Sequence, residues 1–396
     1  MKKDSIIAVL FFMFPFMVLA PGIIWKGQQL FFITMGLVVI AFQIRNLYVR
    51  AFLLFGMVWQ VYIFLSAFNM GINPGPGLSV ILCLLAGGII YKFVSEGMVE
   101  RQAWYSVIRI VVIIQVIIGV LQLAGHNPVT ILLSGITLVR ADLPTHIVGT
   151  LGNRNFLALF IAATLPMFAT WKAATYRGIN WSVVIMVIFL LLCLSPGTMA
   201  GIIGLAIYYV AKRKPKHGAI YLAGSVIAAL IFAAVYMLFI NTDHLNEIRL
   251  LGQQWDELAA NGDVLTDTTQ GDIGRMAMWM MAGYKLFHNG WAFFIGFGPG
   301  AYWGRPYPLH SEYAAMWFQF GLVGILLMAG FIWSNIKLLI KNKDAVLLAS
   351  FSAVCLDMVG NFPMEVASTA FLIAIICGLI EKERLSCLTE GNLARS

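Results

Sequence analysis

One histidine and one arginine in the second half of the chain have side chains suited to chemistry at a phosphate ester. His310 lies two residues before Glu312, at the start of an apolar run. A neutral imidazole can take a proton from a hydroxyl near pH 7, and a neighbouring carboxylate can orient or tune it. A guanidinium such as that of Arg275 can hold phosphate oxygens through paired hydrogen bonds. These groups suggest displacement of a phosphate-linked leaving group, although a histidine at a helix start is more often a cap or a surface residue.

A second candidate is the stretch Gly-Thr-Leu-Gly-Asn-Arg-Asn at 149–155, which precedes another apolar run. Asn153 and Asn155 can cap the helix that follows, and its free N-terminal amides favour an anion. Arg154 would strengthen this preference. We therefore take the three side chains as candidate substrate ligands, with a plain helix cap and an arginine reaching to the membrane surface as the alternative.

A tight turn at 194–204 joins two further apolar runs. Ser195 and Thr198 bring hydroxyl groups to this turn, and they are weaker candidates for substrate binding. The glycines beside them are explained by close helix packing. Arg305 is one more basic residue near His310. Asp357 is an acid at membrane depth, where a functional role and simple helix pairing explain it equally well.

The composition indicates which elements must position these residues. Of 396 residues, 60% are hydrophobic and 11% are charged. A soluble domain carries about 25% charged residues, so a water-soluble enzyme is excluded. The sequence has long unbroken apolar runs, whereas a β-barrel needs short strands of alternating polarity, so a β-barrel is not expected. We expect an all-α, polytopic membrane protein in which residues 1–396 form a single integral membrane domain.

A membrane span needs about 20 apolar residues, and the chain has about twelve such windows. They begin near Ser5, Gln28, Ala51, Gly77, Trp104, Phe156, Ile179, Thr198, Gly218, Tyr313, Asp344 and Met364. The first window has no convincing small-residue cleavage site after it, so we interpret it as a retained helix.

Basic residues predict the orientation, because Lys and Arg accumulate on the cytoplasmic side. With both termini in the cytoplasm, 19 of the 26 Lys and Arg lie on that side. The external side receives Lys26, Arg140, Arg154, Arg249, Arg275, Lys285 and Arg305. The net charge of +8 is thus a topology signal, and no nucleic-acid partner is expected.

Two external segments, about 125–155 and about 241–312, exceed the connections of roughly 2 to 8 residues usual in bundles. The second carries 8 of the 18 acids, and we expect it to form an extracytoplasmic loop subdomain between the ninth and tenth transmembrane helices. Within it, the spacing predicts a helix over 274–287, which should lie in the membrane interface. No Walker loop, dinucleotide fingerprint or zinc motif occurs, and the five cysteines have no metal-ligand spacing.

The order of these motifs resembles the O-antigen ligase and polymerase superfamily of bacterial envelope glycosyltransferases. The matching pieces cover roughly 145–335, with a weaker match at 361–365. They are 149–155, Ser195–Thr198, Arg275 with Trp279, Gly-Phe-Gly-Pro-Gly at 296–300, and His-Ser-Glu-Tyr at 310–313 ahead of 321–324.

The resemblance implies a fold of the GT-C type and an enzyme that needs neither a metal ion nor a cofactor. Such an enzyme would transfer a glycan from an undecaprenyl-diphosphate-linked donor on the periplasmic face of the bacterial inner membrane. His310 would activate the acceptor hydroxyl, and Arg275 would bind the diphosphate. The resemblance implies that the acceptor is lipid A-core, a growing glycan or a protein, and that membrane lipids surround the enzyme.

One departure concerns the turn, where family members usually have arginine after the serine and this chain has Pro196. Arg154 or Arg140 can substitute on the same side, or the protein has a changed substrate or has lost activity. A flippase for lipid-linked glycans and a noncatalytic envelope scaffold are the competing functions. Polar residues gathered in external loops, without repeated halves, favour the transferase over the transporter.

Overall fold

The structure is a computed structural model of the chain. It describes residues 44, 46–51, 53–54, 87–124, 126, 147, 149, 151, 154–171, 175–176, 179–193, 195–213, 275–298, 311–359 and 367–393. The helices are α5 (Arg101–Leu123), α7 (Arg154–Ala169), α8 (Trp181–Leu192), α9 (Pro196–Ala211), α12 (Arg275–His288), α13 (Gly290–Ile295), α14 (Glu312–Lys341), α15 (Ala345–Asp357) and α16 (Ala367–Leu393). Shorter helical stretches cover 47–54 in part and 87–95.

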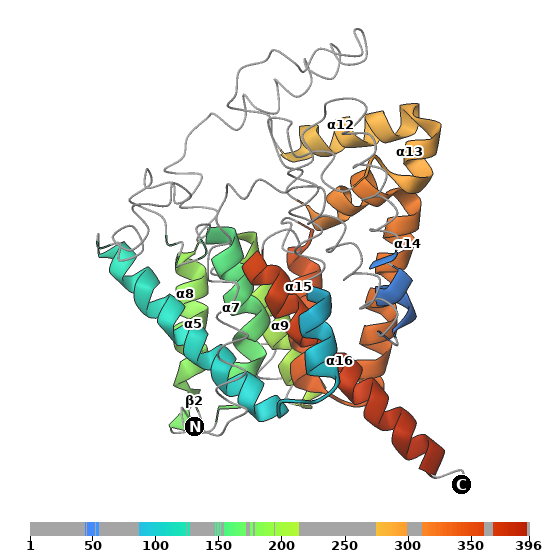
Figure 1. Ribbon diagram of the computed structural model, residues 1–396. Coiled ribbons are helices and arrows are strands. Elements are labelled where there is room, and N and C mark those ends of the chain that lie inside the picture. The colour runs from blue at the N-terminus through green and yellow to red at the C-terminus, as the bar shows by residue number, and fades with distance from the viewer. Residues whose placement is uncertain are drawn as a thin grey trace, which may run out of the picture.

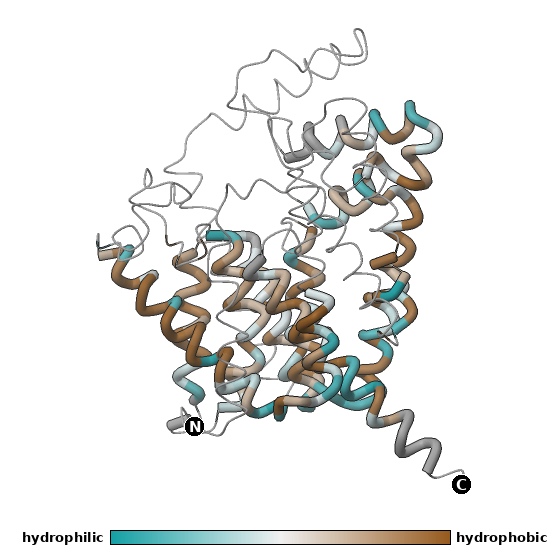
Figure 2. Tube along the Cα trace, in the orientation of Figure 1, coloured by the Kyte–Doolittle hydropathy of each residue, from teal (hydrophilic) through white to brown (hydrophobic). Residues whose placement is uncertain are grey.

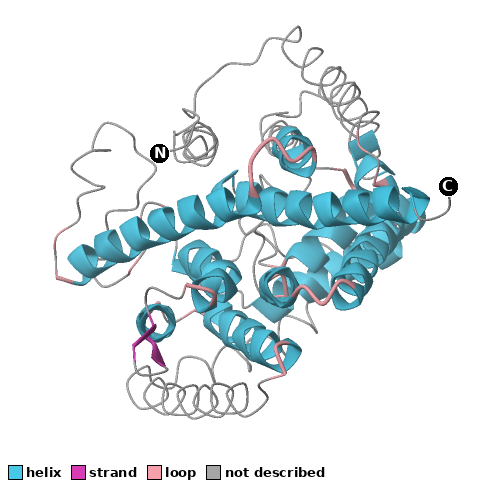
Figure 3. Cartoon of the chain, turned by 90° about the horizontal axis from the view of Figure 1, so that it is seen from below, coloured by secondary structure: helices cyan, strands magenta, loops and turns pink. Residues whose placement is uncertain are grey.

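The described residues are helical apart from one small strand pair. Strands β1 (Thr175–Tyr176) and β2 (Ile179–Asn180) pair antiparallel between α7 and α8. Figure 3 shows this pair at the margin of the helical bundle. The helical class expected from the sequence is confirmed at this level, whereas the count of twelve spans and the GT-C-type fold stay predictions.

Helices α7, α9 and α15 pack closely on one another and form the centre of the bundle (Figure 1). Two glycines of α9 permit this packing. A methyl group on Gly201 would lie 2.9 Å from the Ala162 Cβ of α7, and one on Gly204 would lie 3.0 Å from the Ala353 Cβ of α15. The expectation that glycines in this turn and helix serve close packing is confirmed.

Two described helices, α5 and α14, are long and apolar enough to cross a bilayer, and α7, α8, α9 and α15 are shorter apolar helices. Exposed apolar side chains follow a helical spacing along α5, at Ile110, Ile114, Ile117 and Leu121. A water-soluble protein rarely exposes such a stripe, so this face suits contact with hydrocarbon. The features together indicate a membrane protein.

The bundle has two chemically different ends. Helices α7, α9 and α14 begin at one end, which we call the site end, and finish at the other, which we call the basic end (Figure 1). Hydrophilic residues gather at the basic end and apolar residues fill the middle (Figure 2). The described basic residues at this end include Arg101, Lys212, Arg213, Lys341 and Lys343.

Ion pairs hold helices together at the basic end. The Arg101 guanidinium contacts Asp344 at 2.6 Å and Glu383 at 3.2 Å, which joins the starts of α5 and α15 to α16. Arg384 of α16 donates a hydrogen bond to the Asn335 side chain of α14 at 2.8 Å. These contacts fix the helices laterally where they meet the polar surface.

Helix α12 lies across the site end, above α14 (Figure 1). The predicted helix over 274–287 is confirmed as a helix, and its position at a membrane interface stays a prediction. Helix α13 packs on α14, which breaks at Gly321 (φ 63°). At this break, Phe297 and Gly298 donate backbone hydrogen bonds of 2.9 Å to the carbonyls of Phe318 and Gln319.

Both glycines at this crossing are required by geometry. A methyl group on Gly296 would lie 2.1 Å from the Gln319 carbonyl oxygen, and one on Gly321 would lie 2.4 Å from the Phe294 carbonyl carbon. Both residues have positive φ values, 81° and 63°. The two chain segments therefore cross with backbone against backbone, which only residues without a side chain permit.

Most predicted spans correspond to described helices. Helices α5, α7, α8, α9, α14, α15 and α16 begin within three residues of the windows predicted near 104, 156, 179, 198, 313, 344 and 364. The windows that begin near Ser5 and Gly218 lie outside the described residues. Of the predicted loop subdomain at 241–312, the described part contains α12, α13 and the first residue of α14.

Replacing Gly321 by alanine should destabilise the protein, because a Cβ would collide with the α13 backbone at a strained φ. We expect a loss of about 1–3 kcal/mol, measured as a lower melting temperature of the purified protein in detergent. Gly283→Ala in α12 is the control, since a methyl group there meets nothing within 4 Å. It should leave the protein unchanged or gain up to about 1 kcal/mol. Equal melting temperatures for Gly321→Ala and wild type would contradict the crossing.

Candidate functional site

Four helix ends meet at the site end of the bundle. Asn155 near the start of α7 contacts Ser195 before α9, and Asp357 at the end of α15 lies against Gly197 in α9. The next residue, Met358, accepts a backbone hydrogen bond of 2.9 Å from Glu312 at the start of α14. Three helix N-termini and one helix C-terminus therefore adjoin. The free amides of N-termini favour anionic groups.

A hydrogen bond brings together two predicted substrate ligands from separate motifs. The Ser195 hydroxyl donates to the Asn155 Oδ1 at 2.8 Å, although 40 residues separate them. The same hydroxyl oxygen accepts the Gly197 N–H at 3.3 Å, so Ser195 is also the N-cap of α9. Pro196 occupies the first turn of that helix, where its missing N–H costs nothing.

Thr198 has a structural role. Its hydroxyl donates a hydrogen bond of 2.7 Å to the Leu190 carbonyl of α8, and its side chain is buried. This bond ties the last turn of α8 to the first turn of α9. The hydroxyl is committed to the backbone, so the geometry favours a contribution to the shape of the turn over direct contact with a substrate.

Asp357 is buried beside the start of α9. A methyl group on Gly197 would lie 2.9 Å from its Oδ1 and 3.0 Å from the Leu159 backbone nitrogen of α7. The side chain is only 2% exposed. A carboxylate near a helix N-terminus is favourably placed. Both explanations considered for this acid, helix pairing and a place in the site, are compatible with its position.

Glu312 is buried in the first turn of α14, with 2% of its surface exposed. Ser311 caps the helix, since its hydroxyl oxygen accepts the Ala314 N–H at 3.3 Å. The Tyr313 hydroxyl donates to the Cys355 carbonyl of α15 at 2.8 Å. The start of α14 is therefore anchored on α15 by contacts from consecutive residues.

Arg154 begins α7 and is half-buried. Its charge reaches the turn between α8 and α9. Burial raises the pKa of the Cys193 thiol in that turn to about 12, and Arg154 acts in the opposite direction. The Arg154 charge therefore acts on the turn that precedes α9.

The remaining predicted residues are only partly visible. Arg275 is the first residue of α12. Asn153, Arg305 and His310 lie outside the described residues, as do Arg140 and the stretch 361–365. Within the described part of the chain, no three His, Cys, Asp or Glu side chains are grouped so that they could hold a metal ion. The catalytic assignments of His310 and Arg275 stay predictions.

Sequence reasoning missed a clamp on the motif at 149–155. Gln122, in the last turn of α5, donates from Nε2 to the Gly149 carbonyl at 3.1 Å and accepts the Gly149 N–H at 2.9 Å. Gly149 has a φ of 56°, and Gln122 is buried. A glutamine inside an apolar helix is the signal that could have revealed it, because a buried amide needs partners.

A comparison with protein families identifies the region that contains most of these motifs. Residues 181–329 match the model of the O-antigen ligase family. Over these residues the chain is similar to the O-antigen ligase family. The match includes Ser195–Thr198, Arg275, the glycine loop at 296–300 and 310–313, whereas the motif at 149–155 lies outside it. A search of curated proteins gave no match.

The family assignment confirms the resemblance seen in the sequence. It supports a membrane enzyme of the glycosyltransferase or ligase type that carries out glycan transfer of the O-antigen ligase or polymerase kind. Its partners are in general a lipid-linked glycan and an acceptor.

The hydrogen bond between Ser195 and Asn155 predicts energetic coupling. Ser195→Ala and Asn155→Ala should each lower stability by about 1 kcal/mol, and the double variant should lose less than the sum, with a coupling of about 1 kcal/mol. Thermal unfolding of the four proteins in detergent measures this. Ser106→Ala is the control, because that exposed hydroxyl bonds only the Gln102 carbonyl of its own helix. Strictly additive losses would argue against the contact.

Proposed function

We propose that the protein transfers a glycan from an undecaprenyl-diphosphate-linked donor to an acceptor hydroxyl. The reaction takes place on the periplasmic face of the bacterial inner membrane, with both termini of the chain in the cytoplasm. The observation that carries the proposal is the O-antigen ligase match over 181–329, which includes both Arg275 and His310. The meeting of three helix N-termini at the site end supports it, because a diphosphate is an anion.

The proposed step is a substitution at the anomeric carbon of the donor. The acceptor oxygen forms a bond to that carbon, the bond from carbon to the diphosphate oxygen breaks, and the acceptor proton passes to His310. Arg275 pairs with the diphosphate and stabilises the charge that develops on the leaving oxygen. Glu312 would orient or tune His310 from the first turn of α14.

Secondary contacts in the proposal come from the start of α7. Arg154 directly precedes Asn155, whose side chain accepts the Ser195 hydrogen bond, and the family's usual arginine after this serine is Pro196 here. We assign to Arg154 part of the phosphate binding that this arginine would provide. Asn153, Asn155 and Arg305 complete the proposed substrate ligands, with Ser195 and Thr198 shaping the turn.

His310→Ala and Arg275→Ala should each reduce glycan transfer by about 100-fold or more, since they remove the proton acceptor and the phosphate ligand. The assay uses membranes supplied with undecaprenyl-diphosphate glycan, with products followed by mass spectrometry. The mass of the product also identifies the acceptor as lipid A-core, glycan or protein.

Two variants in α12 provide matched controls for this experiment. His288→Ala removes an exposed histidine that stacks on Tyr284, and Lys285→Ala removes a cation from the last turn of the same helix. Both should retain transfer. Full transfer by His310→Ala and Arg275→Ala would refute the catalytic assignment, and loss in all four variants would point to damage to the fold.

Chelation should have little effect on transfer. In the proposal, guanidinium groups neutralise the diphosphate, so no metal ion is needed to stabilise the leaving group. The same membrane assay, run with and without excess EDTA, should give rates within about twofold of each other. Strong inhibition that is reversed by added Mg²⁺ or Mn²⁺ would replace this mechanism with a metal-dependent one.

A further inference from the structure

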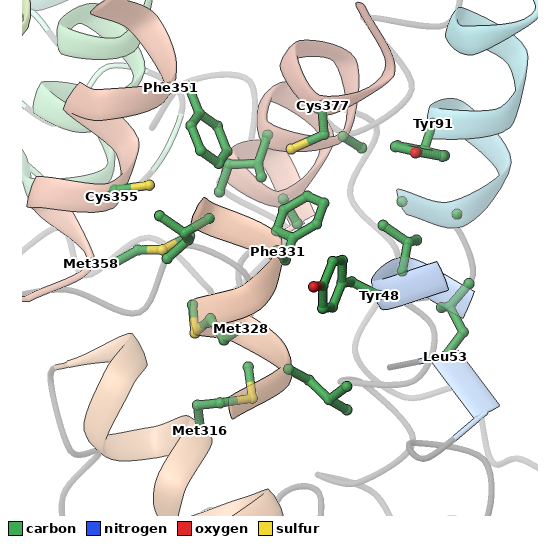
Figure 4. Close-up of a pocket in the computed structure, with 18 residues that line it drawn as sticks. Tyr48, Leu53, Tyr91, Met316, Met328, Phe331, Phe351, Cys355, Met358 and Cys377 are labelled. Atoms are coloured by element: carbon green, nitrogen blue, oxygen red, sulfur yellow. The ribbon is translucent and has the colours of Figure 1, made fainter. Parts of the chain in front are cut away.

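An apolar cavity of about 140 Å³ lies between α14, α15, α16 and the helical stretches at 47–54 and 87–95 (Figure 4). None of the described residues that line it carries a charge. Its polar side chains are those of Tyr48 and Tyr91, together with two cysteine thiols. Such a wall suits a hydrocarbon group and excludes an ionic one, because a charge here would lose its hydration without finding a partner.

The walls of this cavity combine small and adaptable side chains. Gly87 and Ala374 face each other, since a methyl group on Gly87 would lie 3.9 Å from the Ala374 Cβ. Met316, Met328 and Met358 contribute flexible side chains on the opposite wall (Figure 4). Methionine fills irregular spaces and adapts to different shapes, so this wall can fit a branched chain.

The cavity adjoins the site end through α14 and α15. Met358, which lines the cavity, directly follows Asp357, the residue that lies against the start of α9. Met316, another lining residue, is one helical turn beyond Glu312. The backbone hydrogen bond from Glu312 to Met358 thus lies where these helix ends meet the residues that line the cavity. A molecule with an anionic head at the site would have a place for its apolar chain beside it.

We infer that the cavity binds isoprene units of the donor's tail close to the diphosphate. This inference rests on the proposed function, which places a polyprenyl diphosphate head at the neighbouring site. A dry cavity of about 150 Å³ binds benzene, so this one holds about one five-carbon isoprene unit and its methyl branch. The rest of the tail lies among the membrane lipids.

Photolabelling of the wild-type protein tests the inference without any glycan transfer. The full chain, in nanodiscs of phosphatidylglycerol, receives a polyprenyl diphosphate that carries a diazirine on its first isoprene unit and no sugar. We expect labelled peptides from 327–332 of α14 and 370–377 of α16. Excess undecaprenyl diphosphate should abolish this labelling, whereas a phospholipid with a diazirine in its acyl chain should not label these peptides.

A filled cavity provides the second arm of the experiment. Ala374→Phe should reduce labelling of these peptides by about tenfold, because its ring occupies the space of the isoprene unit. Ala329→Phe on the exposed face of α14 is the matched control and should label as wild type does. If Ala374→Phe fails to fold, the labelled positions in the wild-type protein still decide the question.

The outcomes separate the cavity from the proposed reaction. Labelling outside the cavity, or equal labelling by the phospholipid probe, would overturn the inference even where glycan transfer is intact. Specific labelling of the cavity in a wild-type protein that transfers no glycan would uphold the prenyl site and refute the transferase function. Labelling of the cavity together with transfer supports both.

Discussion

Helix ends that lie among apolar side chains must satisfy their backbone N–H and C=O groups within the protein, and this constraint explains many polar residues of the site. Ser195 and Ser311 cap α9 and α14. Where α14 breaks, the N–H groups of Phe297 and Gly298 bond its carbonyls. The hydroxyls and glycines of the family motifs thus have a structural role at the helix ends. In the proposed mechanism, Arg275 binds the phosphate and His310 accepts the proton.

The limits of sequence reasoning follow from the range of the interactions involved. Helix positions could be predicted because apolar length and spacing are local properties, as for α7, expected near Phe156 and found from Arg154. The contact between Ser195 and Asn155 depends on how α7 packs against α9, which no local pattern specifies. The same holds for Gln122 at Gly149 and for the apolar cavity. Thr198 is a further case, since the bond of its hydroxyl to a carbonyl of α8 depends on how α8 and α9 meet.

The two ends of the bundle are stabilised by different forces. At the basic end, Arg101 pairs with Asp344 and Glu383 across three helices. Charged pairs are suited to this polar boundary, where the side chains remain partly hydrated. At the site end, the contacts are single hydrogen bonds between caps, backbone groups and Asn155. This division fixes the helices by ion pairs at the end far from the site.

The end of α15 joins these features to the chemistry of an amphiphilic substrate. Asp357 lies against the polar start of α9, and the next residue, Met358, lines the apolar cavity. A lipid-linked donor also has a polar part next to an apolar part, since its charged diphosphate is followed directly by an isoprenoid chain. In an enzyme that recognises both parts, the lining of the binding site must change from polar to apolar where the diphosphate joins the isoprenoid chain. The adjacent residues Asp357 and Met358 provide such a change, because one lies against a polar helix start and the other lines the apolar cavity. The hydrogen bond from the Glu312 N–H to the Met358 carbonyl holds this segment, so the arrangement requires α14 and α15 to keep their mutual position.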